Sequence, residues 1–149
     1  MINKTHLALA SALMLLFLPH INNKFLFVPV ILIASLLPDI DSASSQIGHR
    51  WFLRPLQWFL KHRGMIHSFT FCVLVSLLLA FFVPVLSLPF FLGYFSHIFA
   101  DSLTVEGIRP FWPMKKEVSG HLRTGSAVEE GIFLALIFVN VAIFISWFI

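Results

Sequence analysis

The chain has 149 residues, of which 58% are hydrophobic and 11% are charged, against roughly a quarter charged in an ordinary soluble domain. This balance excludes a disordered chain, which combines low hydrophobicity with high charge, and a coiled coil, which needs abundant Glu and Lys in heptads. The single cysteine, Cys72, excludes an intramolecular disulfide. The composition predicts a membrane protein. Its net charge of +3 comes from basic residues that flank apolar segments, which favours membrane lipids over nucleic acid as the partner.

Five apolar segments follow one another along the chain, and each is predicted to form a helix. They cover residues 7–19, 25–38, 65–83, 88–104 and 131–149. The third and fifth approach the ~20 residues that a helix needs to cross ~30 Å of hydrocarbon, whereas the first two are short. The predicted fold is all-α, a single domain over residues 1–149 that forms an integral membrane helical bundle of about five transmembrane helices.

Basic residues are distributed unequally between the two sides that such a bundle would have. If all five segments cross, one side carries Lys24 alone and the other carries Lys4, Arg50, Arg54, Lys61, Arg63, Arg109, Lys115, Lys116 and Arg123. Because cytoplasmic loops are enriched in Lys and Arg, this predicts a multi-pass plasma-membrane protein whose loops 39–64 and 105–128 lie in the cytoplasm. Basic and aromatic residues alternate over 47–60, which predicts a short interfacial amphipathic helix.

His97 and Asp101 are the most informative polar pair, because they lie inside the fourth apolar segment. Residues four apart are about 40° apart around a helix, so one face carries both side chains. An ionised carboxylate there costs several kcal/mol unless it is paired, and a cation bound by imidazole and carboxylate removes that cost. A His–Asp hydrogen bond that joins helices is the alternative, but ionisable residues inside a membrane favour the functional interpretation.

Two further polar clusters stand at the ends of neighbouring segments. Asp39 and Asp41 follow a proline at the end of the second segment, where a departure from helical geometry lets both carboxylates face one site. His62 and His67 flank Gly64 at the start of the third, and a turn at the glycine lets both imidazoles point inward. Taken alone, the first cluster is equally typical of a solvated turn, and the second is more typical of polar residues at a membrane interface.

All these ionisable residues lie toward the cytoplasmic ends of their segments. His6 and Glu129 stand at the starts of the first and fifth segments, so the set draws on all five: His6, Asp39, Asp41, His62, His67, His97, Asp101 and Glu129. Helices that converge at this end would build a polar well of imidazoles and carboxylates. Such a well suits one or two divalent transition-metal ions, with zinc favoured and manganese as the alternative.

A metal ion in such a well activates water and polarises phosphoryl oxygens, so hydrolysis at the level of lipid headgroups is expected. The predicted function is an integral membrane metal-dependent hydrolase, a phosphoesterase acting on a lipid or lipid-linked headgroup at the cytoplasmic face. The metal ligands are predicted to be His6, Asp39, His67, His97 and Asp101. The further ligands or general acid/base groups are Asp41, His62 and Glu129. Arg63 is the candidate for binding the substrate phosphate, although such residues are also typical positive-inside anchors.

Two alternative functions use the same residues. A proton or metal-ion transporter would need polar groups through the full membrane depth, and the outer halves of the third and fifth segments are almost entirely apolar. A non-catalytic membrane protein with a structural metal would need no open coordination position. The usual signatures of soluble enzymes, HExxH, GxSxG, the P-loop and CxxC, are absent from the sequence, and a serine or cysteine nucleophile has no support.

Four ordered motifs carry a resemblance to a known family. They are residues 37–41, 62–68, 93–104 and 111–113, preceded by His6 and followed by Glu129. In this order they resemble the YdjM-like family of LexA-regulated inner-membrane proteins, which are described as metal-dependent hydrolases. The resemblance spans nearly the whole chain and implies that the eight residues above form the site. Ile66 stands where the family commonly has Thr, which implies one fewer hydroxyl beside the site. A more distant resemblance to zinc-dependent phospholipase C and related nucleases implies phosphoester chemistry.

Overall fold

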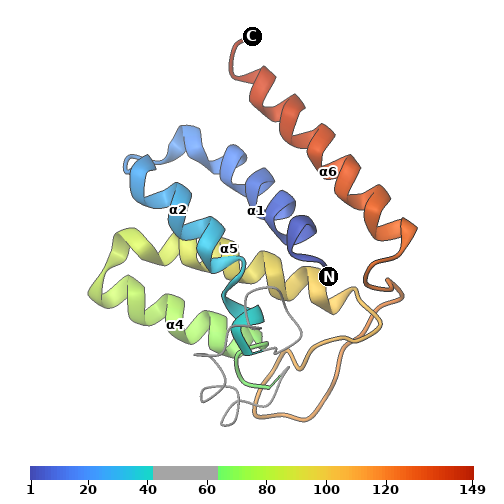
Figure 1. The fold of residues 1–149 in the computed structure, drawn as a ribbon. Coiled ribbons are helices and arrows are strands. Elements are labelled where there is room, and N and C mark those ends of the chain that lie inside the picture. The colour runs from blue at the N-terminus through green and yellow to red at the C-terminus, as the bar shows by residue number, and fades with distance from the viewer. Residues whose placement is uncertain (42–63) are drawn as a thin grey trace.

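The computed structural model describes residues 1–41 and 64–149. Within these ranges the chain forms helices and turns, without a β-strand. The helices are α1 (Asn3–Phe17), α2 (Lys24–Ala34), α4 (Phe69–Phe82), α5 (Pro84–Ser102) and α6 (Ala127–Ser146), with 3-10 turns at Leu18–His20 and Leu37–Asp41 (Figure 1). The all-α prediction is confirmed. The surface helix expected over 47–60 lies outside the described residues.

Local sequence signals set the ends of these helices. The hydroxyl of Ser68 accepts a hydrogen bond from the backbone N–H of Phe71 at 3.1 Å, so α4 begins at Phe69. Pro84 cannot continue that helix and instead occupies the first turn of α5. Ser126 caps α6 by accepting from the backbone N–H of Glu129 at 3.3 Å. The fourth and fifth helices therefore begin at residues 84 and 127, four residues earlier in each case than predicted.

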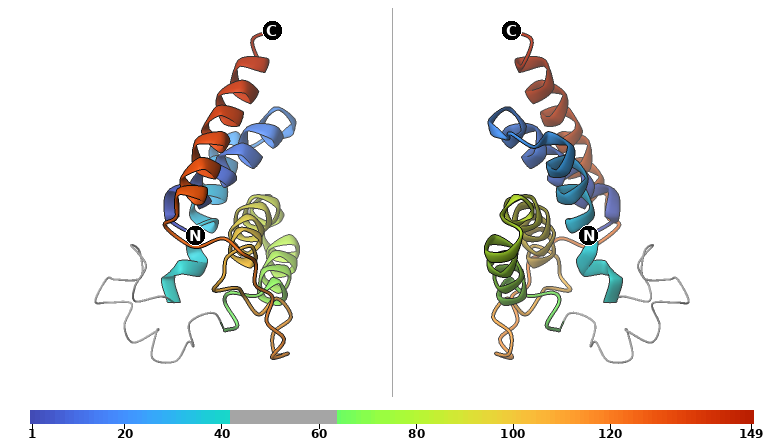
Figure 2. Two further views of the ribbon diagram at one scale, coloured as in Figure 1. Left: turned by 90° about the vertical axis from the view of Figure 1, so that its right-hand side faces the viewer. Right: turned by 90° about the vertical axis from the view of Figure 1, so that its left-hand side faces the viewer.

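The helices pack as two hairpins and one outlying helix. Helices α1 and α2 form one hairpin and α4 and α5 the other, and α5 packs against α2, α4 and α1 (Figures 1 and 2). Helix α6 packs mainly against α1 and rises away from the rest of the bundle. Gly93 allows the close contact of α5 with α2, because a Cβ atom there would lie 2.1 Å from the carbonyl oxygen of Ile31. One cluster of the buried hydrophobic core consists of Ala34, Cys72, Phe90, Tyr94, Ile98 and Ile108.

One helix of the described chain, α6, is both long enough and apolar enough to span a membrane, and only 6% of its most apolar 18-residue stretch is buried. Helices α2 and α4 are apolar but have 11 and 14 residues. At 1.5 Å per residue, α4 is about 21 Å long, which is short of the ~30 Å of hydrocarbon. The predicted count of about five transmembrane helices is therefore not confirmed. The cap at Ser68 and the break at Pro84 shorten the third segment, which the hydropathy of the sequence alone did not reveal.

Candidate metal centre

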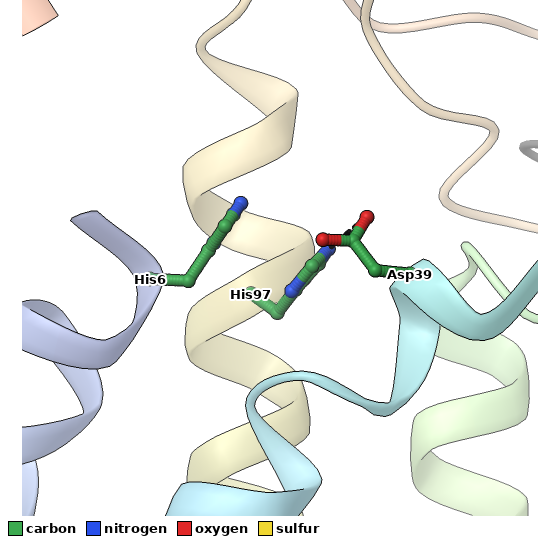
Figure 3. A group of neighbouring side chains, drawn as sticks. All are labelled: His6, Asp39 and His97. Atoms are coloured by element: carbon green, nitrogen blue, oxygen red, sulfur yellow. Dashed lines mark ion pairs between the residues drawn. The ribbon is translucent and has the colours of Figure 1, made fainter. Parts of the chain in front are cut away.

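Five of the predicted site residues meet at one end of the helical bundle. His6 lies in the second turn of α1, His97 and Asp101 lie in the last turns of α5, and each side chain is almost fully buried. Asp39 lies in the 3-10 turn after α2, and His67 lies two residues before α4. Figure 3 shows His6 and Asp39 on either side of His97. Taken as whole residues, none of the five is more than 9% exposed, so the fold has withdrawn these ionisable groups from water.

The donor atoms of these side chains converge on a small volume. Asp101 is central, because its carboxylate oxygens lie 3.3 Å from His6 Nε2, 3.6 Å from His97 Nε2 and 3.8 Å from His67 Nε2. Asp39 Oδ1 lies 3.7 Å from His97 Nε2. Two groups of three ligands share His97, namely His6, Asp39 and His97, and His67, His97 and Asp101. Tetrahedral zinc with bonds of ~2.0–2.1 Å separates its ligand atoms by about 3.3 Å, close to the spacings found here.

The orientation of His97 indicates what the cluster requires. Its Nδ1 lies 2.7 Å from the backbone carbonyl oxygen of Ser35. A carbonyl oxygen only accepts, so Nδ1 carries the proton, and in the neutral ring the lone pair of Nε2 faces the carboxylates of Asp39 and Asp101. Among the described residues, His97 Nε2 and both ring nitrogens of His6 have no hydrogen-bond partner. A buried lone pair that faces two carboxylates favours a cation between them, either a proton or a metal ion, and a borderline divalent metal fits this set of donors.

Two features show the electrostatic cost of the cluster. Burial raises the pKa of the Asp39 carboxyl, and the neighbouring His97 opposes this change only in part. The α-amino group of Met1 lies 2.5 Å from Asp101 Oδ1 and supplies one positive charge. A metal ion that takes this oxygen of Asp101 would have to displace the amine. Buried carboxylates are stabilised by a nearby positive charge, and a metal ion could supply that charge here.

Glu129 has surroundings different from those of the five clustered residues. Its Oε1 accepts hydrogen bonds from the backbone N–H of Ile2 at 2.6 Å and from the hydroxyl of Thr5 at 3.1 Å. Its Oε2 accepts from the backbone N–H of Gly125 at 2.6 Å. Glu129 belongs to neither group of candidate ligands. Its carboxylate instead joins the start of α6 to the start of α1, next to His6.

A family profile described as YdjM inner membrane protein matches residues 1–149. The chain belongs to the YdjM family. It is 38% identical over 97 residues to the inner membrane protein YdjM of Escherichia coli (strain K12), and equally so to that of Shigella flexneri. Each match covers 59% of this chain and 50% of the relative, so the chain spans about half the length of these relatives. The uncharacterized protein YvsG of Bacillus subtilis (strain 168) is 27% identical over 121 residues, covering 74% of this chain and 76% of that protein. No solved structure matches.

The family membership confirms two predictions made from the sequence. The resemblance to YdjM-like proteins holds over the whole chain, and the names of the relatives support an inner-membrane location. The names say nothing of an activity. The comparisons therefore leave metal binding and hydrolysis untested.

The structure brings together some of the predicted site residues and leaves others apart. The five predicted metal ligands meet, and Glu129 lies beside them in a separate hydrogen-bond network. His62 and Arg63 lie outside the described residues, and Asp41 ends the 3-10 turn that carries Asp39. The sequence did not reveal the carbonyl of Ser35 as the partner of His97, because a backbone acceptor leaves no signal in residue type.

Glu129 is expected to position the start of α1, and therefore His6. Replacing Glu129 with Ala removes an acceptor of three hydrogen bonds from a buried site, which should lower the free energy of unfolding by ~3 kcal/mol and the zinc affinity by ~10-fold. The neighbouring Glu130→Ala is the matched control, because the pair of Glu130 with Lys4 is about half exposed. Thermal unfolding and chelator competition in detergent measure both effects. Equal behaviour of the two variants would show that Glu129 has no such role.

Proposed function

We propose that the protein is a multi-pass inner-membrane hydrolase that depends on a divalent metal, zinc first and manganese second, and cleaves phosphoesters in lipid or lipid-linked headgroups. The observation that supports it best is the buried cluster of imidazoles and carboxylates, whose closest nitrogen–oxygen distances are 3.3 to 3.8 Å. A divalent ion in such a site supplies a nucleophile from water near pH 7 and polarises a phosphoryl oxygen. The proposal assigns metal binding to His6, Asp39, His67, His97 and Asp101.

Other residues have separate roles in this proposal. The hydrogen bond to Ser35 holds the imidazole of His97 in the tautomer whose Nε2 is free to bind a metal. The side chain of Asp39 is the more exposed of the two carboxylates, at 13% against 3% for Asp101, so Asp39 lies closer to an incoming substrate. Five donors exceed the four that one structural zinc takes, which supports one ion with a donor to spare or two ions. Asp41 and His62 remain the candidates for acid/base catalysis, and Arg63 for phosphate binding.

The multi-pass arrangement with a site facing the cytoplasm is part of the proposal. Helix α6 is long enough to span the bilayer, and both helical hairpins expose large apolar side chains, among them Phe25 at 95% and Phe81 at 81%. Such exposure suits contact with lipid chains. Figure 1 shows the N-terminus, the C-terminal end of α5 and the start of α6 on the same side of the bundle. Of the basic residues in the described part of the chain, all but Lys24 belong to the segments on that side, which supports a cytoplasmic location for it.

Reconstitution of the full chain tests the proposed activity. The zinc-loaded protein in liposomes should release phosphorylated headgroups or inorganic phosphate from a panel of phospholipids and polyprenyl phosphates. Asp101→Asn should lower this turnover by at least ~100-fold, because it removes a ligand central to the cluster. His121→Ala, which changes an exposed histidine, should leave turnover unchanged. Metal or proton flux into sealed liposomes, without turnover, would reject the hydrolase in favour of a transporter.

A further inference from the structure

The connection between α5 and α6 forms a hairpin that is fixed to the helical bundle. Ile108 and Val118 exchange two backbone hydrogen bonds of 2.9 Å, and the guanidinium of Arg109 donates to Glu117 at 2.6 and 3.0 Å. The carbonyl oxygen of Pro110 accepts from the backbone N–H of Phe69 at 2.9 Å, which ties the hairpin to the start of α4. The segment therefore has a defined conformation, and it lies at the end of the bundle that holds the metal-ligand cluster (Figures 1 and 2).

The tip of this hairpin is apolar, basic and exposed. Its large apolar side chains are Phe111, Trp112 and Met114, which are 57%, 40% and 60% exposed. Lys115 and Lys116 follow directly and are also exposed. Neither lysine forms an ion pair within the described part of the chain, whereas Arg109 and Glu117 neutralise each other. The tip thus combines two lysines that have no ion-pair partner in the described chain with three apolar side chains that are each at least 40% exposed.

We propose that this hairpin tip, residues 111–116, inserts into the headgroup region of an anionic membrane leaflet on the side of the metal-ligand cluster. Tryptophan and phenylalanine favour the interface between headgroups and acyl chains, and lysines extend from it to lipid phosphates. The membrane location of the family makes such a surface available to a segment on this side. Charge complementarity therefore selects acidic phospholipids as the partner. The proposal does not depend on the hydrolase activity.

The depth of the tip in a bilayer can be measured on the full chain. A nitroxide label at Met114→Cys, in protein whose native Cys72 is buried and unreactive, reports access to oxygen and to a water-soluble nickel chelate. In nanodiscs of phosphatidylglycerol, the label at Met114→Cys should be more accessible to oxygen than to the nickel chelate, as expected for a position within the interface. A second label at Thr124→Cys, an exposed position outside the tip, should be more accessible to the nickel chelate than the label at Met114→Cys is. Equal nickel access at both positions would overturn the proposal.

Charge variants separate lipid binding from contact with protein. Lys115→Gln with Lys116→Gln should weaken the attraction of the tip to the anionic leaflet by ~30-fold and expose the label to nickel. Lys115→Arg with Lys116→Arg keeps both charges and should keep the label protected. High salt or phosphatidylcholine nanodiscs should act in the same direction as the glutamine variant. A label that stays protected under all these conditions would indicate a protein surface as the partner and would also overturn the proposal.

Discussion

Replacing His97 with Ala is expected to lower the affinity of the protein for zinc by more than ~100-fold. His97 belongs to both groups of candidate ligands, and its Nε2 lies 3.6 Å and 3.7 Å from the carboxylates of Asp101 and Asp39. Changes to residues that merely orient a ligand already cost about 10- to 100-fold in metal affinity, so the loss of the shared ligand should cost more. Competition with a chromogenic zinc chelator, on purified protein in detergent, measures the change.

His121→Ala is the matched control for this experiment. His121 is an exposed histidine outside the cluster, so its replacement removes the same chemical group without touching the site. Its zinc affinity should equal that of the wild type. If His97→Ala and His121→Ala bind zinc equally well, then the zinc is held by surface groups and the assignment of the cluster fails.

Replacing Gly93 with Ala is expected to lower the free energy of unfolding by at least ~3 kcal/mol. The added Cβ would lie 2.1 Å from the carbonyl oxygen of Ile31 and 3.0 Å from the Cβ of Ala34, so α2 must move away from α5. Helix α2 leads directly into Ser35 and Asp39, which contact His97. The variant should therefore lose zinc affinity as well as stability. Thermal unfolding of the metal-free protein and chelator competition measure the two effects separately.

Gly131→Ala provides the contrast, because it places the same methyl group on a helix where no atom lies within 4 Å of it. Alanine favours helix over glycine, so this variant should be as stable as the wild type or more stable, by up to ~1 kcal/mol. Zinc affinity should not change. Equal stability of the Gly93→Ala and Gly131→Ala variants would mean that α2 and α5 do not pack through Gly93.

The sequence predicted the helices and their approximate positions, because a long apolar segment in a membrane must satisfy its own backbone hydrogen bonds and therefore forms a helix. It misplaced several helix ends. Ser68 and Ser126 act as caps through single hydroxyl groups, and a cap outside an apolar run is invisible to hydropathy. The predicted number of membrane-spanning helices stays unconfirmed for a similar reason, since α4 has 14 residues whereas the apolar segment at 65–83 is longer.

The candidate site was predictable to the extent that it rests on chain topology. The spacing of His97 and Asp101 places both on one face of α5, and the shared end of the segments brings His6, Asp39 and His67 to them. Contacts that depend on tertiary packing were not predictable. The stacking of the His6 and His97 rings at 3.8 Å is one example, and the network of Glu129 is another. Residue types alone do not indicate which carboxylate will accept hydrogen bonds from the backbone and which will lie beside imidazoles.

The metal content of the purified full chain tests the central claim most directly. Elemental mass spectrometry should find about one or two zinc or manganese ions per wild-type chain. A variant that combines His97→Ala with Asp101→Ala should contain none, while circular dichroism shows that its helices remain. A wild-type protein that holds neither metal after reconstitution, or a double variant that holds as much as the wild type, would contradict the metal centre and the proposed hydrolase with it.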